Sequence, residues 1–210
     1  MARAPRAYLP GVPVHVIQRG NDRASMFAET ADYECFRNCA IIAARRFDLA
    51  VHAYVLMTNH VHMLATPGRP DSLSRAMHWV GTVFVQDVNI RHRRSGSRIE
   101  GRYKCRFIQD DAHFLACMRY IESNPVRAAM VKAPESYRWS SYHANACGKS
   151  DSLVSPHQIF SRLGTAPDDC RTAYRNLFGT AISPTELEAL RMPTRARGRP
   201  PNGARPCNGV

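Results

Sequence analysis

Short stretches of the chain alternate between hydrophobic and polar residues, as half-buried β-strands do. Thr58 and Asn59 separate two of these stretches and form a connection of the length found in tight β-hairpins. We therefore expect the two flanking strands to pair antiparallel. The predicted strands span residues 12–18, 51–57, 60–66 and 102–108.

Other stretches place hydrophobic residues three or four positions apart, which is the pattern of amphipathic helices. The longest predicted helices span residues 31–47 and 72–91. A third helix begins at Asp110 and Asp111, whose carboxylates suit the positive end of the helix dipole, and it stops at Asn124 and Pro125. Shorter helices are predicted over residues 126–131, 156–163, 168–178 and 184–191.

The central order of elements is therefore β-α-β-β-α-β-α, which predicts an α+β fold: an antiparallel sheet with helices packed on it, of ferredoxin-like character. We expect this domain to span residues 1–145 and a small helical extension to span residues 146–191. Residues 192–210 are rich in Arg, Pro and Gly and contain no acidic residue, so we expect a disordered basic tail.

Charge gives the first indication of a partner. The chain has 210 residues, and 29 Lys and Arg against 17 Asp and Glu give a formal net charge of +12. This excess points to a polyanion, most often nucleic acid. A GC-rich genome would favour arginine over lysine, but it would not explain the excess of basic over acidic residues.

Several classes of protein are disfavoured by composition. The seven cysteines contain no Cys-x-x-Cys spacing, which argues against a zinc ribbon or a disulfide framework. The sequence has no apolar run of membrane-spanning length and no secretion signal near its start. We expect a cytoplasmic protein with no membrane partner.

A His-x-His pair lies on the third predicted strand. Because side chains alternate along a strand, His60 and His62 point to the same face and can ligate one divalent metal ion. The same spacing also arises on a half-exposed polar face, and spacing alone slightly favours that interpretation. The other histidines singled out are interpreted as packing or surface residues: His15, His52, His78 and His113.

Tyr120 and Asn124 lie four residues apart on the third predicted helix, so they share one side of it. Tyr120 lies beside the apolar stripe of this helix, a position that would leave its hydroxyl available for chemistry. The alternative is that Tyr120 is an amphipathic surface residue and that Asn124 caps the helix that Pro125 begins.

Taken together, the His-x-His strand and the later helix with Tyr120 and Asn124 resemble the HUH single-tyrosine transposases. The resemblance is closest to the REP-associated tyrosine transposases of bacteria, and it covers most of residues 8–145. Thr58 departs from the family, which usually has proline before Asn-His, and we expect little effect. The segments that carry the resemblance are residues 10–21, 52–62, 100–104, 118–128 and 138–142.

The resemblance implies an enzyme that cleaves and rejoins single-stranded, hairpin-forming DNA, with repetitive extragenic palindromes (REPs) as the natural target. His60 and His62 would hold Mg²⁺ or Mn²⁺ over the scissile phosphate, and Asn124 matches the position of the third ligand. Tyr120 would attack phosphorus and form a 5′-phosphotyrosine link. A phenol with an ordinary pKa near 10 is a weak nucleophile, so this step needs an electropositive site.

Further residues near these motifs are candidate DNA contacts. Arg19 and Asn21 end the first strand and are placed to contact a DNA guide, and Tyr103 could stack on a base. For each arginine taken singly, a solvated loop is the simpler interpretation. In the tail, residues 197–200 match the core of a minor-groove AT-hook, although flexible arginines also bind phosphates without groove preference. The complete set is Arg19, Asn21, Arg91, Arg93, Arg94, Arg102, Tyr103, Arg197 and Arg199.

Two alternatives stay open. The same fold could bind DNA hairpins without transposing them, or an unrelated metal hydrolase could use His60 and His62. No carboxylate pair and no His-Glu-x-x-His motif supports the hydrolase. We expect a bacterial, nucleoid-associated protein that acts as a monomer or a homodimer.

Overall fold

The computed structural model describes residues 8–190. Its strands are β1 (Val14–Arg19), β2 (Leu49–Met57), β3 (His60–Pro67) and β4 (Lys104–Phe107). Its α-helices are α1 (Thr30–Arg46), α2 (Ser72–Arg91), α3 (Asp111–Glu122), α4 (Asn124–Arg127), α5 (Tyr142–Asn145), α6 (Gln158–Ser161), α7 (Pro167–Asn176) and α8 (Pro184–Leu190). Three short 3-10 helices are η1 (Asn21–Arg23), η2 (Pro134–Ser136) and η3 (Leu177–Gly179).

The strands form one four-stranded antiparallel sheet in the order β2-β3-β1-β4, which confirms the predicted α+β class. Thr58 and Asn59 connect β2 to β3 as predicted. Met57 and His60, on either side of this two-residue turn, form the first pair of the two strands. On the other side of β3, His60 pairs with Arg19 and His62 pairs with Ile17 of β1. The first strand therefore runs directly beside the His-x-His pair.

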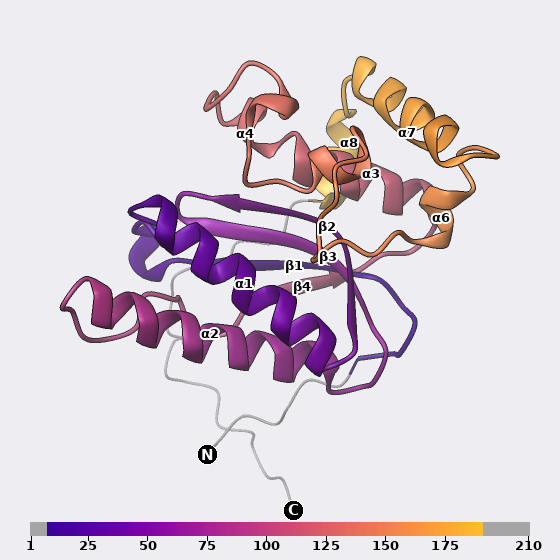
Figure 1. The fold of residues 1–210 in the computed structure, drawn as a ribbon. Helices are drawn as coiled ribbons and strands as arrows, with labels where there is room; N and C mark the ends of the chain where they lie inside the picture. Colours follow the sequence, from indigo (N-terminus) through magenta and orange to yellow (C-terminus); the bar gives the residue numbers. More distant parts are fainter. Residues whose placement is uncertain (1–7, 191–210) are drawn as a thin grey trace, which may run out of the picture.

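Helices cover both faces of the sheet (Figure 1). Helices α1 and α2 lie on one face, where Phe36 and Phe84 pack with Val61 and Met63 of β3. Helix α3 and the later helices lie on the other face, where Phe114 packs with Leu64 of β3. The strict alternation of β3 thus directs neighbouring residues into two separate cores.

The C-terminal helices help to cover α3 (Figure 1). Tyr174 of α7 and Leu190 of α8 are buried in the same core as Phe114. The segment before α5 covers the outer edge of β2, where Ser140 forms a bridge with Val55. The second layer of the fold is therefore built from residues widely separated in sequence.

Some predicted boundaries are wrong by a few residues. The helix expected over residues 126–131 is the single turn α4, which begins at Asn124 and ends because Ala129 adopts a left-handed backbone with φ of 54°. The strand expected from residue 102 begins at Lys104, since Gly101 before it has φ of 46°. Helix α2, by contrast, spans the predicted residues.

Two further findings concern composition. The six cysteines that the structure describes are free thiols. Within residues 8–190, none of the helices combines the length and hydropathy that a bilayer span requires.

Candidate active site

The His-x-His pair lies on the face of the sheet that α3 covers. His60 is half-buried and His62 is 3% exposed, and the centroids of their rings are 4.9 Å apart. Both residues face the same way because they are two apart on β3. The geometry therefore places two imidazoles side by side at the beginning of this strand.

Helix α3 brings Tyr120 against these histidines. The ring of Tyr120 lies 5.7 Å from the ring of His62, in an edge-on arrangement. The side chain of Tyr120 is only 7% exposed and belongs to the core between α3 and the sheet. It thus lies deeper than its position beside the apolar stripe predicted, because that side of α3 packs against His15 and His62 of the sheet.

A positive charge lies on the face of the same tyrosine. The guanidinium carbon of Arg127 is 4.4 Å from the centroid of the Tyr120 ring. Arg127 ends α4, about two helical turns after Tyr120, and is exposed to solvent. Asn124 begins α4 and is partly exposed. Sequence reasoning did not single out Arg127, although its spacing of seven residues from Tyr120 was a usable signal.

The tautomer of His60 follows from its neighbours. The amide nitrogen of Asn59 donates to the carbonyl of Arg23 at 3.2 Å, so the amide oxygen of Asn59 faces His60. His60 Nδ1 must then donate a proton to that oxygen, over 2.6 Å. The proton of the neutral ring is accounted for, and His60 Nε2 keeps a free lone pair.

His62 is held by another histidine. His62 Nδ1 and His15 Nε2 are 2.9 Å apart in a buried hydrogen bond. His15 lies on β1, so the sequence interpretation of His15 as an ordinary packing or surface residue missed this contact. Alternation along β1 places His15 on the same face as Ile17, but the sequence did not show the register that brings His15 next to His62.

Burial keeps these imidazoles neutral. Loss of solvent and, to a smaller extent, the nearby Arg19 together lower the pKa of His60 to about 4. Burial also lowers the pKa of His62 well below its ordinary value, with His15, His60, Arg19 and Arg127 adding to the effect. A neutral imidazole is the form that ligates metal. Two neutral imidazole rings with Nε2 available are donors that suit a divalent cation.

Glu122 fixes the end of α3 that carries Tyr120. Its carboxylate is fully buried and accepts hydrogen bonds from Ser141 Oγ at 2.5 Å, Asn145 Nδ2 at 2.8 Å and Tyr174 Oη at 2.7 Å. Burial raises the pKa of Glu122 to about 7, while these three donors oppose the rise. The group anchors α3 to both α5 and α7, and sequence reasoning did not identify it.

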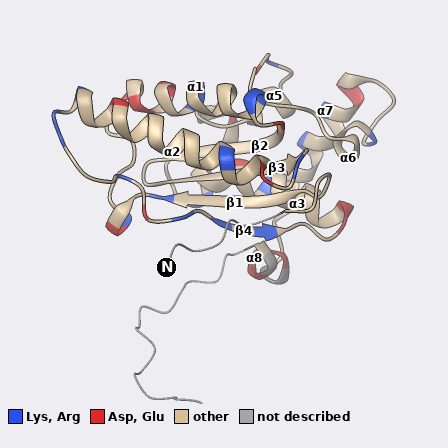
Figure 2. Cartoon of the chain, turned by 90° about the horizontal axis from the view of Figure 1, so that it is seen from below, with Lys and Arg blue, Asp and Glu red and all other residues tan. Residues whose placement is uncertain are grey.

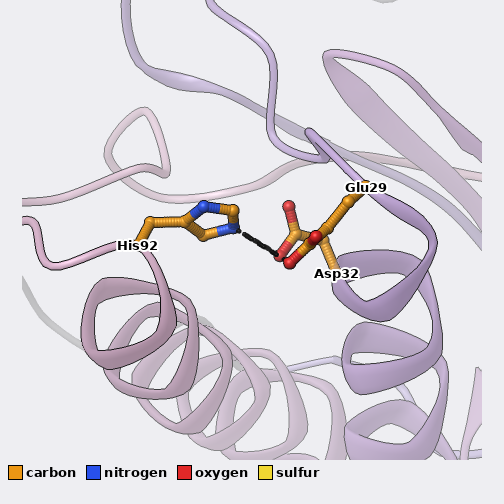
Figure 3. A group of neighbouring side chains, drawn as sticks. All are labelled: Glu29, Asp32 and His92. Atoms are coloured by element: carbon orange, nitrogen blue, oxygen red, sulfur yellow. Dashed lines mark hydrogen bonds and ion pairs between the residues drawn. The ribbon is translucent and has the colours of Figure 1, made fainter.

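A second cluster of potential ligands lies where α1 and α2 meet (Figure 3). Glu29, Asp32 and His92 each offer a ligand atom within 4.8 Å of the others. Arg91, however, forms ion pairs with Glu29 at 2.9 Å and with Asp32 at 2.8 Å. Its guanidinium already neutralises these carboxylates, so the cluster joins two helices rather than forming a cation site.

This pairing changes the picture of Arg91, which the sequence suggested as a DNA contact. The guanidinium also bonds Asp87 at 2.7 Å, and three acidic partners hold it in the protein. Arg93 and Arg94 follow α2 and are exposed, so they keep the surface position that was expected. Basic residues also lie along β4, as Figure 2 shows.

The remaining candidate DNA contacts lie in two places. Arg19 is partly exposed and pairs with His60 in the sheet. Asn21, Arg102 and Tyr103 line a cavity of about 790 Å³ beside α2. Tyr103 is 7% exposed and its hydroxyl contacts that of Tyr8 at 2.8 Å, so its ring is not an open stacking platform. Arg197 and Arg199 lie outside the described residues.

Comparison with known families now identifies the class of protein. Residues 9–124 match the family described as IS200-like transposases. Because this match spans more than half of the sequence, the chain belongs to the IS200-like transposase family.

One solved structure supports the fold. A REP-associated tyrosine transposase bound to a REP hairpin aligns with a TM-score of 0.60 and 21% identity, over 75% of this chain and 93% of that chain. A putative transposase from Deinococcus radiodurans aligns with a TM-score of 0.40 and 15% identity, over 53% of this chain and 89% of that chain. No curated protein matches this sequence.

Proposed function

We propose that this transposase cleaves and rejoins single-stranded, hairpin-forming DNA through a covalent link to Tyr120. The observation that carries the proposal is the 5.7 Å separation of the Tyr120 and His62 rings, on elements that only the fold brings together. A tyrosine nucleophile beside paired neutral imidazoles suits phosphoryl transfer from DNA.

The chemistry follows from the residues at the site. Tyr120 Oη loses its proton to solvent and attacks the scissile phosphorus, while the bond from phosphorus to the 3′ oxygen breaks. The 3′ oxygen takes up a proton and leaves as a hydroxyl, and the 5′ phosphate stays on the tyrosine. Attack by another 3′-hydroxyl reverses the step and rejoins the strands. The guanidinium of Arg127, over the Tyr120 ring, would stabilise the developing phenolate.

A divalent cation would complete the site. His60 Nε2, His62 Nε2 and the Asn124 amide oxygen would hold it, and it would supply Lewis-acid polarisation of a phosphoryl oxygen. All three ligands are neutral, so they leave the charge of the ion available to phosphate. Imidazole suits Mn²⁺ better than Mg²⁺, and we expect Mn²⁺ to support activity at least as well.

The proposed substrate rests on a relative. The similar solved structure is that of a transposase bound to a REP hairpin, and we propose hairpins of such palindromes as the target here. Arg19 lies beside His60 and would contact the strand entering the site. Asn21 and Arg102, which line one cavity, would contact the DNA next to it.

Covalent capture tests the proposal. Single-stranded hairpin DNA labelled at its 3′ end, the end that would stay on the protein, is incubated with the protein and Mn²⁺, and a denaturing gel resolves a protein–DNA adduct. The adduct should form with the parent and disappear with Tyr120→Phe, which removes one oxygen. Tyr33→Phe is a matched control on the opposite face of the sheet, where Tyr33 stacks on Trp139, and it should leave the adduct unchanged.

An adduct of normal yield in Tyr120→Phe would refute the assignment of the nucleophile. Specific hairpin binding with no adduct in the parent would favour a protein that recognises such hairpins without cleaving them.

A further inference from the structure

We propose that His15 is a positioning residue for the histidine pair: its Nε2 can accept a hydrogen bond from His62 Nδ1, and this bond supports the His62 tautomer whose Nε2 lone pair binds a divalent cation. This inference rests on the proposed function, because it concerns the same site. It adds a residue that lies outside the His-x-His motif and on another strand.

The geometry isolates this hydrogen bond from solvent. His15 is 1% exposed, and its Nε2 lies 2.9 Å from His62 Nδ1. The two rings are nearly parallel, with centroids 5.1 Å apart and an angle of 24° between their planes. The Tyr120 ring closes the remaining side, 5.8 Å from the His15 ring. Water is therefore excluded as an alternative partner for His62 Nδ1.

Counting protons defines two states of the pair. A neutral imidazole carries one proton, and only one proton can lie between His15 Nε2 and His62 Nδ1. If His62 donates, its Nε2 is bare and can bind a cation. If His15 donates, the proton of His62 sits on Nε2 and blocks that atom. Both states have the same net charge, so the choice between them is a choice of tautomer.

The two histidines of the motif differ in how this choice is made. Asn59 presents an oxygen to His60, and an oxygen can only accept, so the His60 tautomer is fixed. His15 presents a nitrogen that can accept or donate. Binding of a cation at His62 Nε2 selects the state in which His15 accepts, and the His15 proton then resides on its Nδ1.

The surroundings of His15 indicate that its side chain serves mainly to hydrogen-bond His62. Its Nδ1 is buried and has no hydrogen-bond partner within residues 8–190. The bond to His62 is thus the one hydrogen bond of its side chain in the described chain. An apolar side chain would fill the space without burying an unpaired polar atom, which is costly. Partners of metal-binding histidines commonly fix the ring in this way.

Metal affinity tests the inference without relying on catalysis. Mn²⁺ is titrated, up to millimolar concentrations, into the full-length parent and its variants, and free Mn²⁺ is followed by its electron paramagnetic resonance signal. His15→Leu and His15→Phe remove the acceptor and keep apolar bulk, and melting temperatures show which of them is folded. His15→Gln places an amide near the position of Nε2 and can still accept.

We expect the two apolar variants to bind Mn²⁺ about 10- to 100-fold more weakly than the parent, and His15→Gln to stay close to it. Adduct formation with hairpin DNA should recover in the apolar variants at saturating Mn²⁺. The matched control is His52→Leu, because His52 is a buried histidine of the same face that bonds Ser155 and Thr66 instead. It should lower the melting temperature and leave the Mn²⁺ affinity unchanged.

The outcomes separate this inference from the proposed function. If His62→Ala loses Mn²⁺ binding while the apolar His15 variants match the parent, the role of His15 is refuted and the metal site stands. If the apolar variants, His15→Gln and His52→Leu all weaken binding equally, the effect is one of general stability and the inference is refuted. If His62→Ala binds like the parent, or the parent binds no Mn²⁺, the proposed site fails and the role of His15 fails with it.

Discussion

The guanidinium carbon of Arg127 lies 4.4 Å from the centroid of the Tyr120 ring, so a positive charge rests on the face of the proposed nucleophile. A cation in this position stabilises a phenolate more than a neutral phenol. Arg127→Gln should therefore slow single-turnover formation of the DNA adduct by about 100-fold. Arg127→Lys keeps the charge without the planar group, and its rate of adduct formation should lie between those of the parent and Arg127→Gln.

The chain offers a matched control for this experiment. Arg138 stacks on Trp139 at 4.3 Å, a pair of the same kind outside the proposed site. Arg138→Gln should leave the rate of adduct formation within a few-fold of the parent. Equal losses in Arg127→Gln and Arg138→Gln would mean that general positive charge, rather than contact with Tyr120, sets the rate.

Removal of the metal should stop the reaction. A chelator such as EDTA should abolish adduct formation by the parent, and added Mn²⁺ should restore it. His60→Ala should show the same loss without rescue, because it lacks one imidazole ligand. Circular dichroism should confirm that His60→Ala is folded. Persistent cleavage by a His60→Ala, His62→Ala double variant would show that the two residues are only a polar strand face.

Acid should destabilise the fold through its buried histidines. The folded-state pKa is lowered by burial to about 3 in His15 and to about 4 in His52 and His60. An unfolded chain titrates near 6.5 and takes up protons that the folded chain refuses. The stability that these neutral histidines contribute to the fold is therefore fully present above about pH 6.5 and is lost as the pH falls toward 4. The melting temperature measured across this window should drop.

Glu122 acts in the opposite direction on the same profile. Its folded-state pKa is raised by burial to about 7, so its contribution is complete below the unfolded value and declines as the pH rises toward neutrality. Glu122→Gln should remove this decline in stability toward neutral pH. The loss of stability at low pH that the histidines cause should then be steeper than in the parent. A melting temperature that is flat from pH 4 to pH 7 in Glu122→Gln would contradict the role given to the histidines.

The network around Glu122 also predicts a loss of stability. Glu122→Ala should lower the free energy of unfolding by about 3 kcal/mol, because three buried donors lose their acceptor. Urea denaturation followed by circular dichroism measures this change. Glu135→Ala, at an exposed acid, should change the same quantity by less than about 0.5 kcal/mol.

The features that the sequence predicts well are those set by local periodicity. The bounds of α2 and the turn between β2 and β3 follow from residues adjacent in the chain. The common orientation of His60 and His62 follows from the two-residue repeat of a strand. Together with the spacing of Tyr120 and Asn124, these patterns were enough to suggest the family.

The features that the sequence does not predict depend on pairings between distant segments. His15 approaches His62 only because β1 is the strand next to β3. Arg91 looked like part of a basic loop, but it pairs with Glu29 and Asp32. Both strands β2 and β3 separate these partners from Arg91 in the sequence. Hydrophobic periodicity reports which face of an element is buried, not what that face meets.

The partners of Glu122 have a consequence for the synthesis of the protein. The hydroxyl of Tyr174 reaches Glu122 from 52 residues further along the chain, and Ser141 and Asn145 also follow it. A ribosome therefore releases the proposed nucleophile well before it releases the groups that hold the nucleophile's helix. A nascent chain that ends soon after residue 124 carries His60, His62 and Tyr120 but cannot complete the packing of α3. The proposed capacity to cut DNA would thus arise only after α7 has emerged.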